Sequence, residues 1–305
     1  MNALANIAIN STASALSPVL EARGLIKYYD QHCILNNINL AIQPGAVVGL
    51  IGRNGAGKST LIRCLLGLLT REAGDCLVFG EPSLALTDSN KARIGYVPQQ
   101  PEALAWLSVK QMLDFVSGFY PRWDHAFVAS TLARWNINTS TLLSKLSPGE
   151  RQRIAVLRAM AYHPELLVLD EPAAALDPVA RRELLRDIVT RAADSGTTII
   201  FSTHIVSDLE RVASEIVFVH DKSLLLHMPM DDIKEHTLCL RLSPETAALQ
   251  TGKIPGEISR RKHGDAGMSI ILQREAQSEW PALCHAPGVR TETLALEDLF
   301  IEVAQ

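Results

Sequence analysis

Residues 52–60, GRNGAGKST, have the spacing of a loop that binds the phosphates of a nucleoside triphosphate. They fit the pattern G-x-x-x-x-G-K-[ST], and the apolar run 46–51 before them is typical of the strand that such a loop follows. Lys58 would place a positive charge at the phosphates, and the Ser59 hydroxyl suits a phosphate-bound Mg²⁺. Glycines allow the turns that point backbone N–H groups at phosphates, and the loop contains Gly52, Gly55 and Gly57.

A second group of polar residues follows strands that are expected to be buried. Residues 166–169 form an unbroken apolar run that ends in Asp170 and Glu171, which indicates a parallel strand covered on both faces. Ligands bind at the carboxyl ends of such strands. A further core strand, residues 197–202, leads into His204, although a lone imidazole is more often structural than catalytic.

Three other places are candidates on weaker local signals. Gln99 follows the short strand 94–97 and could reach a Mg²⁺ or an attacking water, although loop glutamines are usually solvated. Tyr29, rather than Tyr28, is the choice for stacking on an adenine ring; alternatively both are half-buried strand-end residues. Segment 146–152, LSPGERQ, precedes a helix whose start is another anion site.

These residues must be positioned by an α/β core. Helices are expected at residues 59–69, after 146–152, and from an N-cap at Asp177 to Gly196. Residues 102–143 are helical in periodicity and contain three tryptophans, which favours either a docking surface or an internally packed helical subdomain. Strands are expected at residues 19–25, 38–42, 46–51, 76–79, 94–97, 166–169 and 197–202, with Tyr28 and Tyr29 in the turn region after the first.

The bulk properties exclude several classes of protein. The net charge of −4 gives no strong field for nucleic acid. The five cysteines lack any C-x-x-C pair, which argues against a disulfide framework or a zinc site and fits a reducing cytosol. No apolar run reaches the length of a membrane span, and residues 1–18, expected to be a flexible tail, lack the features of a signal peptide.

The character of the chain changes at about residue 228. Strands at residues 238–242 and 268–272 and an amphipathic helix at the end predict a small α+β appendage. The basic run 260–263 is interpreted as the solvated rim of a hairpin rather than a nucleic-acid site.

Taken together, the motifs resemble those of ABC transporter ATP-binding subunits over roughly residues 19–221. The family implies a P-loop NTPase core with a mixed sheet, flanking helices, an antiparallel β subdomain, and a helical subdomain at about residues 102–160. It implies an ATP-binding domain over residues 19–227, followed by the α+β domain at 228–305. The matching segments are the phosphate loop at 52–60, the glutamine loop at Gln99, the signature at 146–150, the Walker B strand at 166–170 with Glu171, the dimer-contacting loop at 175–177 and the switch histidine His204.

The resemblance also implies roles, with ATP and Mg²⁺ as cofactors. The catalytic set would be Glu171 and His204 at the attacking water and γ-phosphate, with Lys58 and Gln99. The metal would be held by Ser59, Gln99 and Asp170. In this family two domains, identical or paralogous, close head to tail over two ATP molecules. The implied nucleotide contacts are Tyr29, Gly52, Asn54, Gly55, Ala56, Gly57, Lys58, Ser59 and Thr60, with Ser147 and Gly149 acting on the nucleotide of the second subunit.

Two departures from the family pattern concern the composite site. Pro148 replaces a glycine of the signature, removes an N–H and fixes φ, which predicts altered geometry at Ser147 and slower turnover. Residues 173–175 are all alanine where small polar residues are usual, which predicts weaker coupling between the two sites.

The resemblance is strongest to bacterial exporters of drugs, bacteriocins and small metabolites, on the segments 120–124, 201–204 and 296–300. It implies a separate transmembrane permease subunit that docks near Trp106–Trp123, and a location on the inner face of the cell membrane. An importer ATPase is the main alternative. Two kinds of soluble ABC ATPase are disfavoured. Chromosome-maintenance or repair ATPases insert a long coiled coil between the phosphate loop and the signature, whereas here only 147 − 58 = 89 positions separate Lys58 from Ser147, with no heptad run. Translation-associated ABC proteins carry two cassettes in one chain, whereas this chain has one.

Overall fold

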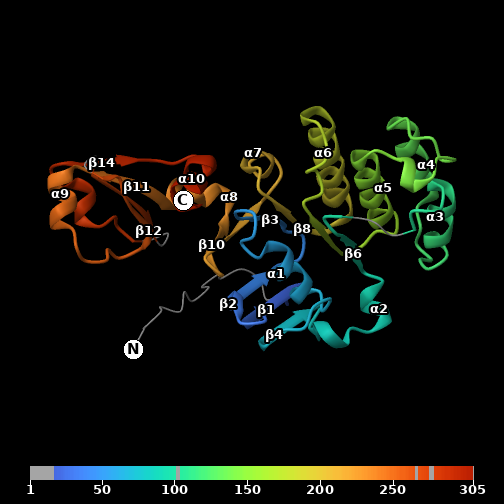
Figure 1. Cartoon of the computed structure of the whole chain (residues 1–305), viewed down its shortest axis with the longest axis horizontal. Helices are drawn as coiled ribbons and strands as arrows, with labels where there is room; N and C mark the ends of the chain where they lie inside the picture. The colour runs from blue at the N-terminus through green and yellow to red at the C-terminus, as the bar shows by residue number, and fades with distance from the viewer. Residues whose placement is uncertain (1–16, 101–103, 265–266, 275–277, 305) are drawn as a thin grey trace.

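The computed structural model describes residues 17–100, 104–264, 267–274 and 278–304. The expected tail at residues 1–18 therefore lies almost wholly outside the described residues. The molecule is elongated (Figure 1), with a sheet and its helices in the middle, a group of helices at one end and the C-terminal strands at the other.

A six-stranded sheet in the order β10-β9-β3-β8-β7-β6 forms the centre. The inner strands are parallel, and only β10 is antiparallel to its neighbour β9. Parallel strands covered on both faces read as continuous apolar runs, and every residue of β7 is buried. The strands are β3 (Val47–Ile51), β6 (Ile94–Val97), β7 (Leu166–Asp170), β8 (Thr198–Thr203), β9 (Glu215–His220) and β10 (Ser223–Pro229).

Two different layers cover this sheet. Leu166 and Val168 of β7 belong to one hydrophobic cluster, with α1 (Lys58–Leu65) and an antiparallel sheet of order β2-β1-β4-β5. Leu167 and Leu169 belong to the opposite cluster, with α5 (Pro148–Met160) and α6 (Pro178–Ser195). Helices α1 and α5 therefore lie on opposite faces. The antiparallel strands are β1 (Leu20–Tyr29), β2 (His32–Ile42), β4 (Ala73–Val78) and β5 (Glu81–Pro82), and the short α2 (Asp88–Lys91) follows them.

A separate cluster joins α5 to the helical region between β6 and β7. Helix α3 (Val109–Ser117) begins with a capping box, and α4 (His125–Arg134) begins with Asp124 as its N-cap. Leu113, Val128 and Leu132 pack with Leu157 of α5 in this cluster. None of the described helices is long and apolar enough to cross a membrane.

The C-terminal residues form a second, four-stranded sheet in the order β12-β13-β11-β14, antiparallel throughout. With α9 between β11 and β12, this is the connectivity of a split βαβ motif. The elements are α8 (Met230–His236), β11 (Thr237–Leu242), α9 (Pro244–Leu249), β12 (Glu257–Lys262), β13 (Met268–Gln273), β14 (Val289–Glu292) and α10 (Leu296–Ala304).

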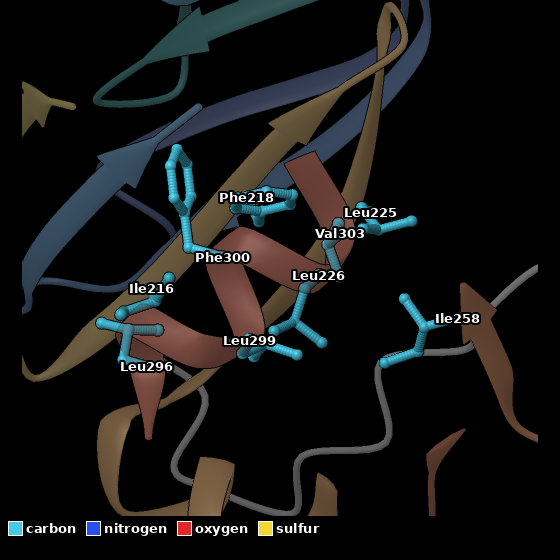
Figure 2. A pocket seen from close by; sticks show the side chains of 9 residues that line it. All are labelled: Ile216, Phe218, Leu225, Leu226, Ile258, Leu296, Leu299, Phe300 and Val303. Carbon is cyan, nitrogen blue, oxygen red and sulfur yellow. The ribbon is translucent and has the colours of Figure 1, made fainter. Parts of the chain in front are cut away.

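Helix α10 joins this sheet to the centre of the molecule. Its apolar residues contact the β9–β10 hairpin, and Phe300 packs edge-on against Phe218 at a centroid distance of 5.5 Å. The helix also contacts β13, β12 and α7 (Val206–Leu209). Between them lies an apolar void of only about 10 Å³, so the interface is closely packed. Figure 2 shows its lining residues, Ile216, Phe218, Leu225, Leu226, Ile258, Leu296, Leu299, Phe300 and Val303.

The Leu299→Ala variant is expected to lower the free energy of unfolding by about 2–5 kcal/mol, because it removes a buried side chain and leaves a cavity. Leu299 is 5% exposed, and Ile301 on the same helix is 43% exposed. Urea unfolding of both variants tests this, and Ile301→Ala should cost less than about 0.5 kcal/mol. Equal losses in the two variants would refute the docking of α10.

Several expectations from sequence were wrong in detail. Helix α5 begins at Pro148, within the segment 146–152 and not after it, and β2 begins at His32, before the expected residue 38. Strand β1 extends to Tyr29, which pairs with His32, so Tyr28 and Tyr29 lie in a strand and not in a turn. Helix α1 ends at Leu65 instead of residue 69. The basic run 260–263 does lie in a hairpin, but Arg260 is not simply solvated, because it donates hydrogen bonds to Glu257 and to the carbonyl oxygens of residues 250 and 252.

Candidate nucleotide-binding and hydrolysis site

The glycine-rich loop connects β3 to α1, and it has the backbone geometry that a phosphate loop requires. Gly57 has φ of 98°, a conformation that residues with a Cβ rarely adopt. Gly52 is constrained by space, because a Cβ there would lie 2.6 Å from the carbonyl oxygen of Val219. Helix α1 begins at Lys58, so its positive end faces the loop.

Lys58 is buried inside this loop. Its Nζ donates to the carbonyl oxygens of Gly52 at 2.8 Å and Arg53 at 3.2 Å. It also lies 3.7 Å from Oε1 of Glu171. Burial lowers the pKa of Lys58, and the carboxylates of Glu171 and Asp170 counteract that shift. The loop thus presents a desolvated cation, the kind of group that binds phosphate strongly.

Asp170 and Glu171 end β7, beside the end of β8. Asp170 is fully buried, and its Oδ1 accepts a hydrogen bond of 2.6 Å from the Ser202 hydroxyl. The same hydroxyl oxygen accepts the Glu171 N–H at 2.9 Å. Ser202 therefore positions both acidic residues, a role that sequence reasoning missed. The signal lay in strand pairing, since Ser202 is opposite Asp170 in the parallel register of β7 and β8.

Glu171 adopts a left-handed backbone conformation with φ of 51°. Such a conformation costs a non-glycine residue on the order of 1–3 kcal/mol and is found mostly at functional sites. It directs the carboxylate between two groups, because Oε2 lies 2.9 Å from Nδ1 of His204 and Oε1 faces Lys58. The structure thus brings together Lys58, Asp170, Glu171 and His204, four residues singled out from the sequence.

Gln99 follows β6, whose end lies beside the end of β7, and it lines a cavity of about 750 Å³ between the central sheet and the helical region. Pro148, Gln152 and Ala175 line the same cavity, so Gln99 and the signature segment open onto a shared space. The Nε2 of Gln152 is buried without a hydrogen-bond partner among the described residues. Tyr29 is 43% exposed at the end of β1, a strand whose buried residues pack with α1, the helix that follows the phosphate loop.

The signature segment forms the start of α5, with Ser147 as its N-cap. Pro148 occupies the first helical position, where the missing N–H would be unpaired in any helix and the fixed φ suits the helix. The geometry at Ser147 is therefore that of a regular helix start. A Cβ on Gly149 would lie 2.8 Å from Cδ2 of Leu176, so this glycine lets the segment approach the loop before α6.

That loop, residues 173–177, is held in place by hydrogen bonds to its backbone carbonyl groups. Arg181 donates to the carbonyl oxygens of Ala173 and Leu176, both at 3.3 Å. Asp177 caps α6 by accepting the N–H groups of Val179 and Ala180, and these bonds lower its pKa. Alanines at 173–175 therefore leave the loop anchored at both ends.

The comparisons with known proteins show which proteins this chain is similar to. The ABC transporter family model matches residues 35–174. The Nod factor export ATP-binding protein I of Cupriavidus metallidurans is 33% identical over 67% of this chain and 69% of its own length. An aliphatic sulfonates import ATP-binding protein, SsuB of Cupriavidus necator, is 36% identical over 66% of each chain.

The fold is also that of solved relatives. A structure described as an ATP binding subunit of an ABC transporter has a TM-score of 0.64 and 27% identity, and the match covers 71% of this chain and 92% of that one. An export protein and an import protein are thus both similar to this chain, which leaves the direction of transport open. The glycine-rich loop, the acidic residues at the end of β7 and these likenesses together establish that the chain belongs to the ATP-binding ATPase subunits of ABC transporters.

Proposed function

We propose that the chain hydrolyses ATP at Lys58, Asp170, Glu171 and His204, and so powers export through a separate transmembrane subunit. The carrying observation is the position of the Glu171 carboxylate, between Nζ of Lys58 and Nδ1 of His204. A base in that position can orient or deprotonate water at a phosphate held by the loop. His204 would hydrogen-bond the γ-phosphate, and Lys58 would neutralise its charge.

The residues present fit a Mg²⁺ ion. Asp170 Oδ2 is buried and has no hydrogen-bond partner among the described residues, as expected of an oxygen that serves a metal or its bound water. Ser59 and Gln99 would supply further oxygens. The ion would neutralise charge on the phosphates, and residues 52–60 would supply the N–H groups that surround them.

We further propose that Ser147 and Gly149 act on a nucleotide held by a second copy or a paralogue. Helices α1 and α5 lie on opposite faces of the central sheet, which supports a site shared between two chains. In this division, residues 19–227 are the ATP-binding domain, with its helical subdomain at about 102–160, and residues 228–305 are a smaller domain joined to it through α10.

The proposed docking surface for the transmembrane subunit is aromatic and lies on the helical region. Trp106 is 71% exposed, Phe119 66% and Phe115 53%, a concentration of exposed apolar area that is typical of interaction sites. Ala105 and Met112 beside them line the wide cavity next to Gln99. Trp123 instead packs within the helical cluster. The proposed docking surface is therefore smaller than the whole segment from Trp106 to Trp123.

The Trp106→Ala variant is expected to lose at least about tenfold in recovery of the transmembrane subunit from solubilised membranes, because it truncates a large exposed anchor. ATP binding should be unchanged. Leu249, which is 85% exposed on α9, provides the control Leu249→Ala, which should recover the subunit fully. Loss of ATP binding together with the partner would argue against a docking role.

Export is favoured over import by the similarity to the Nod factor export protein and by the export-type segments in the sequence. Under this proposal the protein lies on the inner face of the cell membrane, bound to its partner. Import is the alternative, which the similarity to the sulfonates import protein supports. A transporter reconstituted with the copurified subunit should move substrate without an external solute-binding protein; a requirement for one would indicate import.

A further inference from the structure

The start of α5 contains a carboxylate that hydrogen-bonds the signature serine. Ser147 and Glu150 form a capping box, in which the Ser147 N–H donates to Glu150 Oε2 at 2.8 Å and the Glu150 N–H donates to Ser147 Oγ at 3.2 Å. The Ser147 hydroxyl also donates to Glu150 Oε2, at 2.7 Å. One carboxylate oxygen therefore accepts both protons that Ser147 can donate.

The chain contains a second capping box, and comparing the two shows whether capping requires the extra bond from the serine hydroxyl. At the start of α3, the Ser108 N–H donates to Gln111 Oε1 at 2.9 Å, and the Gln111 N–H donates to Ser108 Oγ at 3.2 Å. Among the described residues, the Ser108 hydroxyl donates no hydrogen bond to Gln111. A neutral amide thus closes the same box, and the charge of Glu150 is not needed for capping.

The consequence for anion binding follows from the donors at this helix start. Pro148 has no N–H, and the N–H of Glu150 is bonded to Ser147 Oγ. The remaining local donors are the N–H of Gly149 and the hydroxyl of Ser147, and Glu150 already accepts the latter. Hydrogen bonds from Ser147 lower the pKa of Glu150, so its carboxylate stays charged at neutral pH.

We propose that Glu150 is a positioning residue that holds the Ser147 hydroxyl away from the nucleotide of a second subunit, and so raises the ATP concentration at which two subunits close. The inference rests on the composite site proposed above. A γ-phosphate that reaches Ser147 must take the hydroxyl from Glu150 and approach a carboxylate of like charge. Both effects disfavour closure until ATP is abundant.

The test uses Glu150→Gln in the Glu171→Gln background, in which dimers are expected to accumulate on ATP because hydrolysis is slowed. Dimer formation is followed by analytical ultracentrifugation against ATP concentration. The half-maximal concentration should fall at least about threefold relative to Glu171→Gln alone, because a repulsive charge near the phosphate is removed. Added salt should reduce the difference, because it screens the charge.

Two controls separate this role from a structural one. Gln111→Glu makes the reciprocal change in the other box and should leave the ATP requirement unchanged. Glu150→Gln should also leave ATP binding by the single chain unchanged, since Ser147 acts on the partner's nucleotide. Adding Ser147→Ala to the Glu150→Gln variant should abolish most of the gain, because the released hydroxyl is then absent.

Three outcomes would contradict the inference. An unchanged or higher ATP requirement in the Glu150→Gln variant, while Glu171→Gln alone still dimerises, overturns the role of Glu150 and leaves the composite site standing. A gain that persists fully without the Ser147 hydroxyl also overturns it. Failure of Glu171→Gln to dimerise on ATP removes the composite site, and this inference with it.

Discussion

Replacement of Glu171 by glutamine is expected to give a protein that binds ATP and dimerises on it but hydrolyses it at least about a hundredfold more slowly. The amide has nearly the same shape but cannot accept the proton of the attacking water. The backbone N–H of residue 171 can still donate to Ser202, so the left-handed turn at the end of β7 should be retained.

The surroundings of Glu171 explain why the charge matters there. The side chain is 7% exposed, within 3.7 Å of Lys58 Nζ and 2.9 Å of His204 Nδ1. A carboxylate in such a place is well positioned to act on water beside a phosphate, since little reorganisation is needed.

Steady-state phosphate release measures the rate of hydrolysis, and size-exclusion chromatography with ATP measures dimerisation. Glu210, an exposed carboxylate at the end of α7, offers the matched control Glu210→Gln, which should hydrolyse ATP at the normal rate. Normal hydrolysis in the Glu171→Gln variant would refute the catalytic assignment.

The second large effect is expected from Lys58→Ala, which should weaken ATP binding by about a hundredfold or more. This change removes a buried ammonium group that bonds two loop carbonyls and lies beside Glu171. Without it the phosphates would meet the Glu171 carboxylate with no cation between them. Titration with a fluorescent ATP analogue gives the affinity.

Lys91 provides the matched control for this variant, because it is the same residue type in an exposed position. Its side chain is 61% exposed and pairs with Asp88 in α2. Lys91→Ala should bind ATP normally, and both variants should give a native circular dichroism spectrum. If Lys58→Ala is folded and binds ATP with unchanged affinity, residues 52–60 are not the phosphate site.

Local sequence was sufficient for the elements that carry the chemistry. The strand 94–97 and the apolar run ending in Asp170 are where periodicity predicted them, and α6 begins after Asp177 and ends before Gly196 as its capping residues indicate. These features depend on residues near in sequence, such as an N-cap, a proline at the first turn or a glycine after the last. Local pattern therefore marked the loop with Lys58 and the strand end with Glu171, whereas His204 was assigned a role through the family resemblance.

Other features could not be read from local pattern, because they depend on which strands pair and in what register. Ser202 bridges Asp170 and Glu171 only because β8 lies beside β7. Similarly, the sequence predicted α10 as an amphipathic helix of the α+β appendage, but not that its apolar face packs against the β9–β10 hairpin of the central sheet.

The sequence by itself identified the groups that we propose to carry the chemistry of this protein: a phosphate loop, a pair of acidic residues at a strand end and a histidine. The tertiary structure decided how these groups are held. Ser202 positions both acidic residues, and Lys58 lies buried against Glu171. The physical reason is that hydrogen bonds and burial depend on distances in space, which periodicity along the chain does not specify.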